Sequence, residues 1–368
     1  MKLTEEIRAY IQLHRDEDVR SLALKRGVFS PEQHQFAIQQ ISGWQTAKEK
    51  VPSWATKEEL LYPVHLSLEQ CSSEVTAQFK ASLMNPGESF ADLTGGMGVD
   101  FSFLSRKFQR SLYVEQNPEL CELAEHNFKT LQLSGFHVLN TTFEQCLPQM
   151  SPVEVIYLDP ARRDEAGRKV VSISDCSPNL SEWKSLLLEK SHDIWVKYSP
   201  MLDISLAVNE LENVSELYVI SVQNECKELL FHLTREKSDD LQIVCVDLKK
   251  NGEKTVFKLK KRDEFDSPLH LAEDVGCYLY EPNSSLMKAG AFRILTEKFP
   301  LEKLAVSSHL YTSDEKIETF PGRRFKIESV FSLSKNEVKE NLSDCGKANI
   351  SVRNFPITVD QLRKRPKI

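Results

Sequence analysis

The chain has 368 residues, of which 40% are hydrophobic and 27% are charged, and its formal net charge is −7 at pH 7. This length exceeds one ordinary hydrophobic core and predicts two or three domains. The negative charge argues against a protein that coats nucleic acid indiscriminately. No apolar run approaches the roughly 18 residues that span a bilayer, and the opening MKLTEEIRAY lacks the apolar centre of a secretion signal. We therefore expect a cytoplasmic protein with no membrane partner.

The spacing of the cysteines and the positions of the basic residues bear on metal binding and on contact with nucleic acid. The eight cysteines form no C-x-x-C pair, so the sequence indicates neither a zinc site nor a disulfide framework, and no metal is expected. Residues 318–368 contain 11 Lys or Arg against 6 Asp or Glu, and residues 249–262 contain seven against one. Charge alone favours a solvated tail and a solvated hairpin for these segments, with contact with a polyanion as the alternative.

The pattern of elements changes twice along the chain. Residues 1–85 predict an N-terminal helical domain, with Ser30-Pro31 as a helix start and a helical stretch at 66–83. From residue 86 to 236, short apolar strands such as FADLT, SLYVE, VEVIYLD and DIWVKY alternate with helices, which predicts an α/β, Rossmann-like, doubly wound sheet. From 237 onward, a hairpin at Asn251-Gly252 and further short elements predict a smaller α+β unit, divided into 237–316 and 317–368.

The segment FADLTGGMGVD at 90–100 is the first candidate site. A short strand enters a turn that contains Gly95, Gly96 and Gly98, and glycine lets bare backbone approach a ligand. A plain strand-to-helix turn would also explain these glycines. The third glycine of a dinucleotide fingerprint is missing, and Asp100 places a negative charge where a phosphate would otherwise bind. The turn therefore favours a cationic nucleoside ligand over a pyrophosphate.

The segment LYVEQNPEL at 112–120 supplies the second half of this site. Glu115 ends the next strand, and it follows Asp92 by 115 − 92 = 23 positions, close to the roughly 20-residue offset of a carboxylate that binds a ribose diol. Structural capping is the alternative role for Glu115. S-adenosylmethionine has a nucleoside, a sulfonium and an amino group but no phosphate, so it is the cofactor that these residues favour.

The third candidate segment is VIYLDPARRDEAGRK at 155–169. Its apolar strand ends at Asp159, and Pro160 forces the backbone to leave the sheet at the edge where ligands of α/β proteins bind. Arg162 and Arg163 meet either a phosphate or carboxylate of the acceptor or the neighbouring Asp164 and Glu165.

Three further strings are weaker candidates. KYSPMLDIS leaves a strand at Lys197, and VQNECKELLFH places Asn224, Glu225 and Lys227 between the last two strands; a turn and a solvated hairpin explain both equally well. From the helix that precedes the first strand, Gln70 or Ser73 could reach the methionine end of the cofactor.

Taken together, these segments resemble a known family. The strings are EQCSSEVTAQFKA, DLTGGMGVD, YVEQNPEL, YLDPARRDEAGRKV, KYSPMLDIS, QNECKELL, YLYEPNSSLMKAGAF, SHLYTS, FPGRRFKIESV and KANISVRNFP. They are similar to Bacteroidetes-type class I S-adenosylmethionine-dependent methyltransferases that carry a ferredoxin-like segment and a THUMP-like domain after the catalytic core. The resemblance covers nearly the whole chain from Leu66.

The resemblance implies roles for individual residues. Asp92 occupies the acidic first position of the cofactor motif, and Thr94, Gly96 and Gly98 stand where the family usually carries glycines, with Thr94 as a departure. Asp100, Glu115 and Gln116 join Gly95 in the expected cofactor site. The usual acid that contacts adenine is not evident, and Thr142 is its substitute.

The expected catalytic residues are Asp159, Pro160 and Arg162, and Asp159 also faces the cofactor. In the fourth methyltransferase motif an acid or Asn followed by Pro holds the acceptor, but here Ala161 and Arg162 replace the usual Pro and aromatic residue. The THUMP-like part implies RNA, so we expect methyl transfer from S-adenosylmethionine to a nitrogen of tRNA or rRNA. The alternatives are a protein or small-molecule acceptor, which the acidic charge and the missing aromatic favour, and a non-catalytic RNA-binding protein that retains the cofactor.

Overall fold

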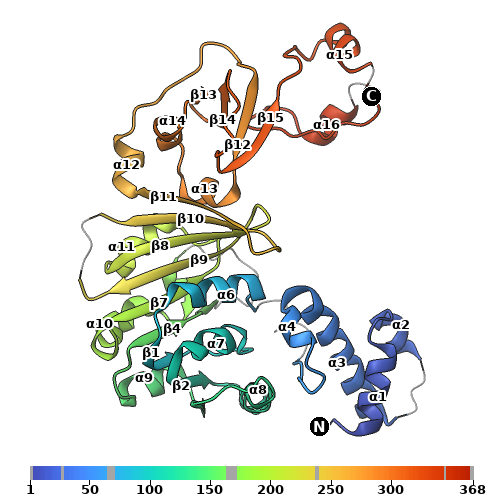
Figure 1. Cartoon of the computed structure of the whole chain (residues 1–368), viewed down its shortest axis with the longest axis vertical. Helices are drawn as coiled ribbons and strands as arrows, with labels where there is room; N and C mark the ends of the chain where they lie inside the picture. Colours follow the sequence, from blue (N-terminus) through green and yellow to red (C-terminus); the bar gives the residue numbers. More distant parts are fainter. Residues whose placement is uncertain are drawn as a thin grey trace. The chain divides into compact units, whose positions relative to one another are not determined.

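The computed structural model describes residues 3–25, 29–63, 71–162, 172–236, 240–343 and 345–364 (Figure 1). The chain divides into two compact units. The first comprises residues 1–217, 227–239 and 248–253, and the second comprises residues 218–226, 240–247 and 254–368.

Capped helices open the first unit. They are α1 (Glu5–His14), α2 (Val19–Leu24), α3 (Pro31–Lys50) and the short α4 (Pro52–Ala55). Thr4, Asp18 and Ser30 precede the first three, and their side-chain oxygens accept hydrogen bonds from backbone amides of the first turn. Ser30 and Gln33 form a reciprocal capping box, so the helix start predicted at Ser30-Pro31 is confirmed.

The next described helix begins at Glu74, whereas the sequence predicts a helical stretch over 66–83. Helix α6 spans Glu74–Leu83, with Ser73 as its N-cap, and Cys71–Ser73 are not helical. Residues 66–70 of the predicted helix, including Gln70, lie outside the described residues. The start at Glu74 follows from Ser73, whose hydroxyl accepts a hydrogen bond from the amide of Thr76 and thereby satisfies a free donor of the first turn.

A nine-stranded sheet follows. Its strands are β1 (Gly87–Asp92), β2 (Phe108–Glu115), β3 (Phe136–Asn140), β4 (Val155–Leu158), β7 (Asp193–Tyr198), β8 (Val214–Val222), β9 (Glu225–Thr234), β10 (Gln242–Leu248) and β11 (Lys254–Lys260). The order is β11-β10-β8-β9-β7-β4-β1-β2-β3. β1 runs parallel to β2 and to β4, and the parallel pairing continues to β3 and to β7. The predicted α/β fold with a Rossmann-like sheet is thus confirmed.

The sheet departs from the predicted parallel arrangement after β7. β9 pairs with β7 in the antiparallel direction. The physical reason is the tight turn at Gln223 and Asn224, which joins β8 to β9 with positive φ at both residues, as a two-residue hairpin requires. The hairpin predicted at Asn251-Gly252 is present between β10 and β11, with Gly252 at φ 85°.

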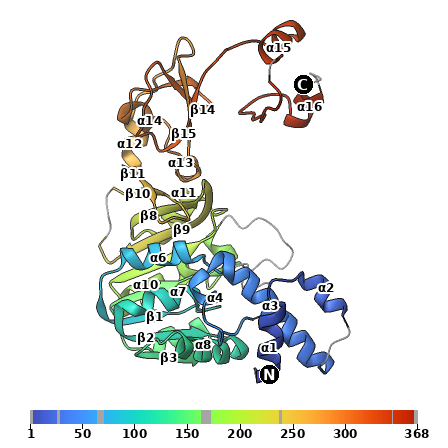
Figure 2. The same ribbon diagram turned by 45° about the vertical axis from the view of Figure 1, so that its right-hand side comes forward.

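Two groups of helices accompany the strands of the first unit (Figures 1 and 2). The first group is α6, α7 (Val99–Leu104) and α8 (Pro118–Thr130), and the second is α9 (Phe143–Gln149), α10 (Leu180–Lys190) and α11 (Ile204–Leu211). The first group shares a core with the N-terminal helices, formed by Ala47, Val51, Trp54, Leu60, Tyr62, Ala77, Met97, Val99 and Leu131. Buried Asn127 of α8 also exchanges two hydrogen bonds with the backbone of Leu61, at 2.9 and 2.8 Å. The N-terminal helices therefore pack directly on the α/β core.

The second unit contains a four-stranded antiparallel sheet in the order β13-β14-β12-β15. Its elements are α12 (Lys261–Asp266), β12 (Tyr278–Pro282), α13 (Ser284–Ala289), α14 (Ile294–Lys298), β13 (Glu302–Ala305), β14 (Ser308–Ser313), β15 (Gly322–Lys326), α15 (Lys335–Leu342) and α16 (Val359–Lys364). Tyr280 and Tyr311 are fully buried, and their hydroxyls donate to the carbonyls of Glu315 and Phe292. The predicted smaller C-terminal α+β unit is confirmed.

None of the described helices combines the length and the apolar character needed to cross a membrane.

Gly43 tests the packing of the N-terminal helices. An alanine Cβ at this position of α3 would lie 2.2 Å from the Cβ of Tyr62. Alanine stabilises a helix by about 1 kcal/mol over glycine, whereas overpacking of a core costs about 1–3 kcal/mol. The cost should exceed the gain here, because the added methyl group meets a buried side chain. We expect Gly43→Ala to lower the free energy of unfolding in urea, whereas Gly346→Ala, with open space around it, should not. An unchanged or higher stability of Gly43→Ala would contradict this packing.

Candidate functional site

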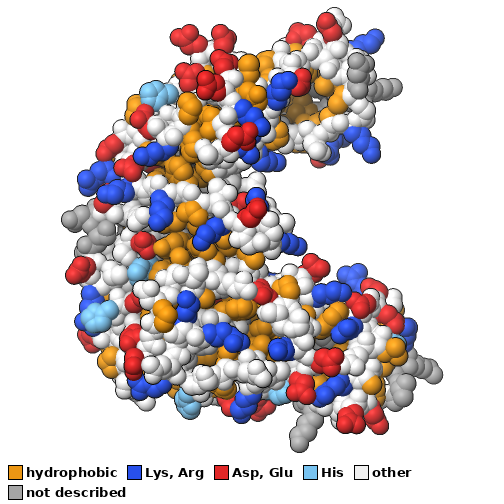
Figure 3. All heavy atoms as spheres, viewed as in Figure 1, with side chains coloured by type: hydrophobic (Ala, Val, Ile, Leu, Met, Phe, Trp, Pro, Cys, Tyr) orange, Lys and Arg blue, Asp and Glu red, His pale blue; other side chains and the backbone are white. Residues whose placement is uncertain are grey.

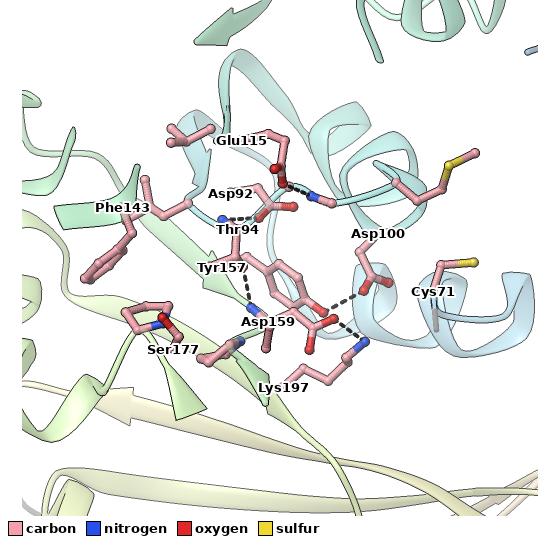
Figure 4. A pocket seen from close by; sticks show the side chains of 18 of the residues that line it. Cys71, Asp92, Thr94, Asp100, Glu115, Phe143, Tyr157, Asp159, Ser177 and Lys197 are labelled. Carbon is pink, nitrogen blue, oxygen red and sulfur yellow. Dashed lines mark hydrogen bonds and ion pairs between the residues drawn. The ribbon is translucent and has the colours of Figure 1, made fainter. Parts of the chain in front are cut away.

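A cavity of about 790 Å³ lies at the carboxyl ends of β1, β2, β4 and β7 in the first unit (Figure 4). It is lined by the residues of all three candidate segments, including Asp92, Glu115 and Asp159. This is the edge of a parallel sheet where α/β proteins bind ligands. In Figure 4, Asp92 and Thr94 lie between Glu115 on one side and Asp159 on the other.

The three glycines of the turn are required for different physical reasons. A Cβ on Gly95 would lie 2.2 Å from the ring of Tyr113, and one on Gly98 would lie 2.8 Å from the ring of Phe128. Gly96 has φ +56°, and the nearest atom to its added Cβ would be the Thr94 carbonyl oxygen at 3.8 Å. Only Gly96 therefore presents open backbone to the cavity, whereas Gly95 and Gly98 make room for aromatic rings of the core.

Asp92 and Thr94 fix the start of this turn. Asp92 is 1% exposed, and its Oδ1 accepts a hydrogen bond from the Thr94 amide at 3.1 Å. Burial raises the pKa of the Asp92 carboxyl well above its usual value. The Thr94 hydroxyl in turn accepts a hydrogen bond from the Asp159 amide at 2.6 Å. A threonine in this glycine position thus connects the turn after β1 to the strand end that carries Asp159.

Glu115 holds the turn from the other side. Its Oε2 accepts from the Gly96 amide at 2.8 Å, and its Oε1 accepts from the Asn117 amide at 2.7 Å. Each carboxylate oxygen can accept a further hydrogen bond, so this contact orients Glu115 without preventing it from binding a diol. The capping and the ligand-binding interpretations of Glu115 are therefore compatible.

The predicted adenine end contains an aromatic residue that the sequence did not single out. Gln116 and Thr142 both line the cavity, and the Thr142 hydroxyl caps α9 by accepting from the Gln145 amide at 3.3 Å. Phe143, the first residue of α9, also lines the cavity and is 5% exposed. A buried aromatic one position after a helix cap resembles any core residue, so the sequence carries no specific signal for Phe143.

Asp100 belongs to a buried ion network behind the turn. Its Oδ1 lies 2.9 Å from Lys80 Nζ, and its Oδ2 accepts from the Ser72 and Tyr157 hydroxyls, both at 2.7 Å. Lys80 is fully buried in α6 and also pairs with Glu228 of β9 at 3.2 Å. The sequence predicts that the negative charge of Asp100 acts on the ligand. In the structure, Lys80 neutralises most of that charge within the protein.

The two carboxylates that flank Lys80 respond differently to burial. Burial by itself raises the pKa of Asp100, but the ammonium groups of Lys80 and Lys197 outweigh it and lower that pKa. Burial raises the pKa of Glu228, and Lys80 only partly offsets this increase. The difference follows from Asp100 having the shorter ion pair and two additional hydroxyl donors.

Asp159 lines the cavity directly after the end of β4. Its Oδ2 is 2.5 Å from Nζ of Lys197, one residue before the end of β7, and Pro160 and Ala161 also line the cavity. Ala161–Arg162 form β5, which pairs with β6 (Cys176–Ser177). The predicted roles of the Arg162 side chain and of Arg163 fall outside what the structure describes.

Some predicted residues lie elsewhere and others were missed. Ser73 does not line the cavity because it caps α6, whereas the preceding Cys71 and Ser72 do line it. Lys227 lines the cavity, as suggested, beside Glu228, which the sequence analysis did not select. Glu228 directly precedes an apolar run in its strand, which indicates a buried carboxylate. A buried carboxylate needs a cation as partner, and this was the signal in the sequence that could have identified Glu228.

The charges of the cavity fit S-adenosylmethionine. Among the described residues, its acidic lining is Asp92, Asp100, Glu115, Glu144, Asp159 and Glu228, and its lysines are Lys197 and Lys227, with Lys80 behind the turn offsetting part of the charge of Asp100 and Glu228. Such a site suits a cationic ligand and disfavours a phosphate. Gly96 and Glu115 offer the open backbone and the carboxylate for a nucleoside. Among the described residues, no group of three His, Cys, Asp or Glu side chains is placed to hold a metal ion.

Lys80 tests the ion network. Lys80→Met leaves two buried carboxylates without their cation, so we expect a loss of about 3–5 kcal/mol in the free energy of unfolding at pH 7. Asp100, whose folded pKa is lowered, contributes stability above its unfolded pKa of about 4 that disappears as the pH falls. Glu228, whose pKa is raised, acts in the opposite sense and is better tolerated when protonated.

The loss in Lys80→Met should therefore be smaller at pH 4 than at pH 7, as measured by urea unfolding at both values. Lys129→Met, which removes an exposed pair with Glu125, is the control and should cost about 0.5 kcal/mol or less. Equal losses for the two variants would show that the network does not carry the stability assigned to it.

Comparisons with known proteins agree with this geometry. Family models match residues 78–205 ("Conserved hypothetical protein 95"), 278–321 ("ferredoxin-like domain") and 322–368 ("THUMP domain-like"). Two proteins of Mycobacterium tuberculosis, from strains CDC 1551 / Oshkosh and H37Rv, are 22% identical over 81% of this chain and 79% of their own length. Both are named uncharacterised S-adenosylmethionine-dependent methyltransferases.

A solved structure covers nearly the whole chain. It is described as "Crystal structure of putative methyltransferase from Porphyromonas gingivalis W83", and it is 32% identical with a TM-score of 0.87. The match covers 99% of this chain and 92% of that one. The fold, the cavity and these likenesses agree with the resemblance found in the sequence. The chain belongs to this family of S-adenosylmethionine-dependent methyltransferases.

Proposed function

We propose that the protein transfers the methyl group of S-adenosylmethionine to a nitrogen of RNA, with Asp159 orienting the acceptor. The observation that carries this proposal is the position of the Asp159 carboxylate, which faces the cavity next to the turn expected to hold the cofactor. One hydrogen bond, from the Asp159 amide to Thr94, connects the two halves of the site.

The cofactor would be held mainly by the turn and by Glu115. Glu115 would accept hydrogen bonds from the ribose hydroxyls, and the open backbone at Gly96 would allow close approach. Asp92 lines the cavity but is almost fully buried, so it would act mainly by holding the Thr94 amide and thereby the turn. Gln116, Thr142 and Phe143 line the side expected for the base. When bound, S-adenosylmethionine supplies an already activated methyl group.

The protein's own contribution to the chemistry is then positioning. Asp159 would accept a hydrogen bond from the N–H of the acceptor and direct the nitrogen lone pair at the methyl group, with the backbone at Pro160 beside it. Alignment of this kind contributes up to roughly 7–11 kcal/mol to a reaction of two bound partners. Asp159 need not be a strong base, because the proton can leave after the transfer.

RNA as the acceptor is supported by the match of residues 322–368 to a THUMP domain-like family. Several arginines of the second unit already have carboxylate partners: Arg323 and Arg353 pair with Glu281, and Arg324 pairs with Glu318. Figure 3 likewise shows Lys and Arg side chains interspersed with Asp and Glu. We therefore expect RNA binding through a limited number of phosphate contacts, with moderate rather than steep salt dependence.

A protein or small-molecule acceptor is the second candidate. Two observations favour it: the net charge of −7, and the absence of an aromatic residue directly after Asp159-Pro160 on which a base could stack. Binding of RNA that does not change between 50 and 200 mM salt, or that is absent, would support this candidate over RNA.

Two alanine variants separate cofactor binding from turnover. Asp159→Ala should lower the methylation rate at least about 100-fold while S-adenosylhomocysteine binding, measured by calorimetry, changes little. Glu115→Ala should weaken that binding about 10- to 100-fold, because it removes hydrogen bonds to charge of about 1.5–3 kcal/mol. Equal loss of binding in both variants would contradict the two assigned roles.

The acceptor can be identified in cells. Nucleosides from tRNA and rRNA of a strain that lacks the protein should miss one methylated nucleoside when analysed by mass spectrometry. The wild-type protein should restore it, and Asp159→Ala should not. An unchanged set of methylated nucleosides in both RNA classes would exclude them as the acceptor and direct the search to proteins and small molecules.

A further inference from the structure

Lys197 lies beside Asp159 because of the strand register. β4 and β7 pair in parallel with Leu158 opposite Val196, so Asp159, which directly follows β4, lies beside Lys197, which is still within β7. Lys197 Nζ and Asp159 Oδ2 are 2.5 Å apart, and the lysine side chain is 10% exposed against 36% for the aspartate. A nearly buried ammonium thus contacts one oxygen of a carboxylate that still reaches the cavity.

The network behind the turn holds Lys197 in this place. Lys197 Nζ donates to the Ser72 hydroxyl at 3.4 Å, and the same hydroxyl accepts from Lys80 at 2.8 Å and donates to Asp100 at 2.7 Å. Burial alone would lower the pKa of Lys197, but the carboxylates of Asp159, Asp100 and Glu228 raise it above the usual value. Lys197 therefore stays charged throughout the physiological pH range, and its position follows from the packing of α6.

The ion pair between Lys197 and Asp159 is not explained by a contribution to stability. A buried ion pair is often no more stabilising than apolar side chains of the same shape, because both charges lose their hydration. The clear effect of the ion pair is to fix the orientation of the Asp159 carboxylate. Asp159 is fixed at its backbone amide by Thr94 and at Oδ2 by Lys197, while Oδ1 has no hydrogen-bond partner among the residues that the structure describes. The carboxylate therefore offers one defined acceptor position.

We propose that Lys197 is a positioning residue for methyl transfer: its ammonium holds Oδ2 of Asp159, so that Oδ1 is directed at the hydrogen carried by the methyl-accepting atom. This inference rests on the proposed role of Asp159 but not on RNA as the acceptor. It also assigns a purpose to the Ser72–Lys80–Asp100 cluster, which supports Lys197 from behind.

The test compares four forms of the full chain: wild type, Lys197→Met, Lys197→Arg and Lys184→Met. Lys184 is the matched control, since it is a half-buried lysine of α10 that pairs with Glu212 at 3.0 Å and does not line the cavity. Each protein is incubated with methyl-tritiated S-adenosylmethionine and an undialysed lysate of a strain that lacks the protein. Label is then counted separately in RNA, in protein and in small molecules other than the cofactor, while S-adenosylhomocysteine affinity and the urea unfolding midpoint are measured in parallel.

Lys197→Met should lower the rate of methyl incorporation about 100-fold, the usual effect of a misplaced reacting group. Its affinity for S-adenosylhomocysteine should stay within about 3-fold of wild type, because Lys197 acts on the acceptor side. Lys197→Arg should restore most of the rate, since it keeps a cation beside Asp159, and Lys184→Met should match wild type. A purely structural lysine would not give this split between rate and binding.

Several results would overturn the proposal. These are an unchanged rate in Lys197→Met, a loss of cofactor affinity as large as the loss of rate, or no rescue by arginine in a folded protein. If Lys197→Met does not fold, Lys197→Gln replaces it, and failure of both neutral variants to fold assigns Lys197 to folding instead. Label in protein or small molecules would contradict RNA as the acceptor while leaving the Lys197 comparison intact. No label from wild type in any fraction would contradict both.

Discussion

The burial of the Lys80 ammonium is the constraint on which the functional half of this protein depends. A fully buried cation needs carboxylate partners, and here they come from Asp100 after the glycine turn and from Glu228 on β9, 148 residues away in sequence. Because Tyr157 of β4 and Ser72 before α6 also bond to this cluster, four separate segments are held in one arrangement. The shape of the cavity wall is thus fixed by charge pairing rather than by apolar packing alone.

The turn after β1 shows how one motif satisfies two requirements. Gly95 and Gly98 are needed because Tyr113 and Phe128 occupy the space where their side chains would lie, whereas Gly96 leaves backbone open to the cavity. Packing of aromatic rings beneath the turn and access for a ligand above it therefore select glycine at neighbouring positions for different reasons. Glu115 then fixes the turn through the Gly96 amide, which joins the ends of β1 and β2.

Thr94 and Lys197 fix the position of Asp159 relative to the turn after β1. The Thr94 hydroxyl accepts a hydrogen bond from the Asp159 amide, and Lys197 holds one oxygen of the Asp159 carboxylate, so Asp159 is fixed at both its backbone and its side chain. Methyl transfer requires alignment more than proton-transfer chemistry. A rigid carboxylate beside the turn that we propose holds the cofactor is well suited to such a reaction.

The sequence by itself determined the order of the elements, the α/β fold, the glycine-rich turn after β1 and the strand-end carboxylates Glu115 and Asp159. These depend on local patterns: apolar runs, glycines, and acids that follow strands. Only the tertiary structure decided that Asp100 is paired within the protein, that β9 runs antiparallel to β7, and that Lys80, Lys197 and Glu228 meet. Lysines and glutamates are ordinary surface residues in a sequence, and their pairing depends on strand order and register, which bring distant segments together without a local signal.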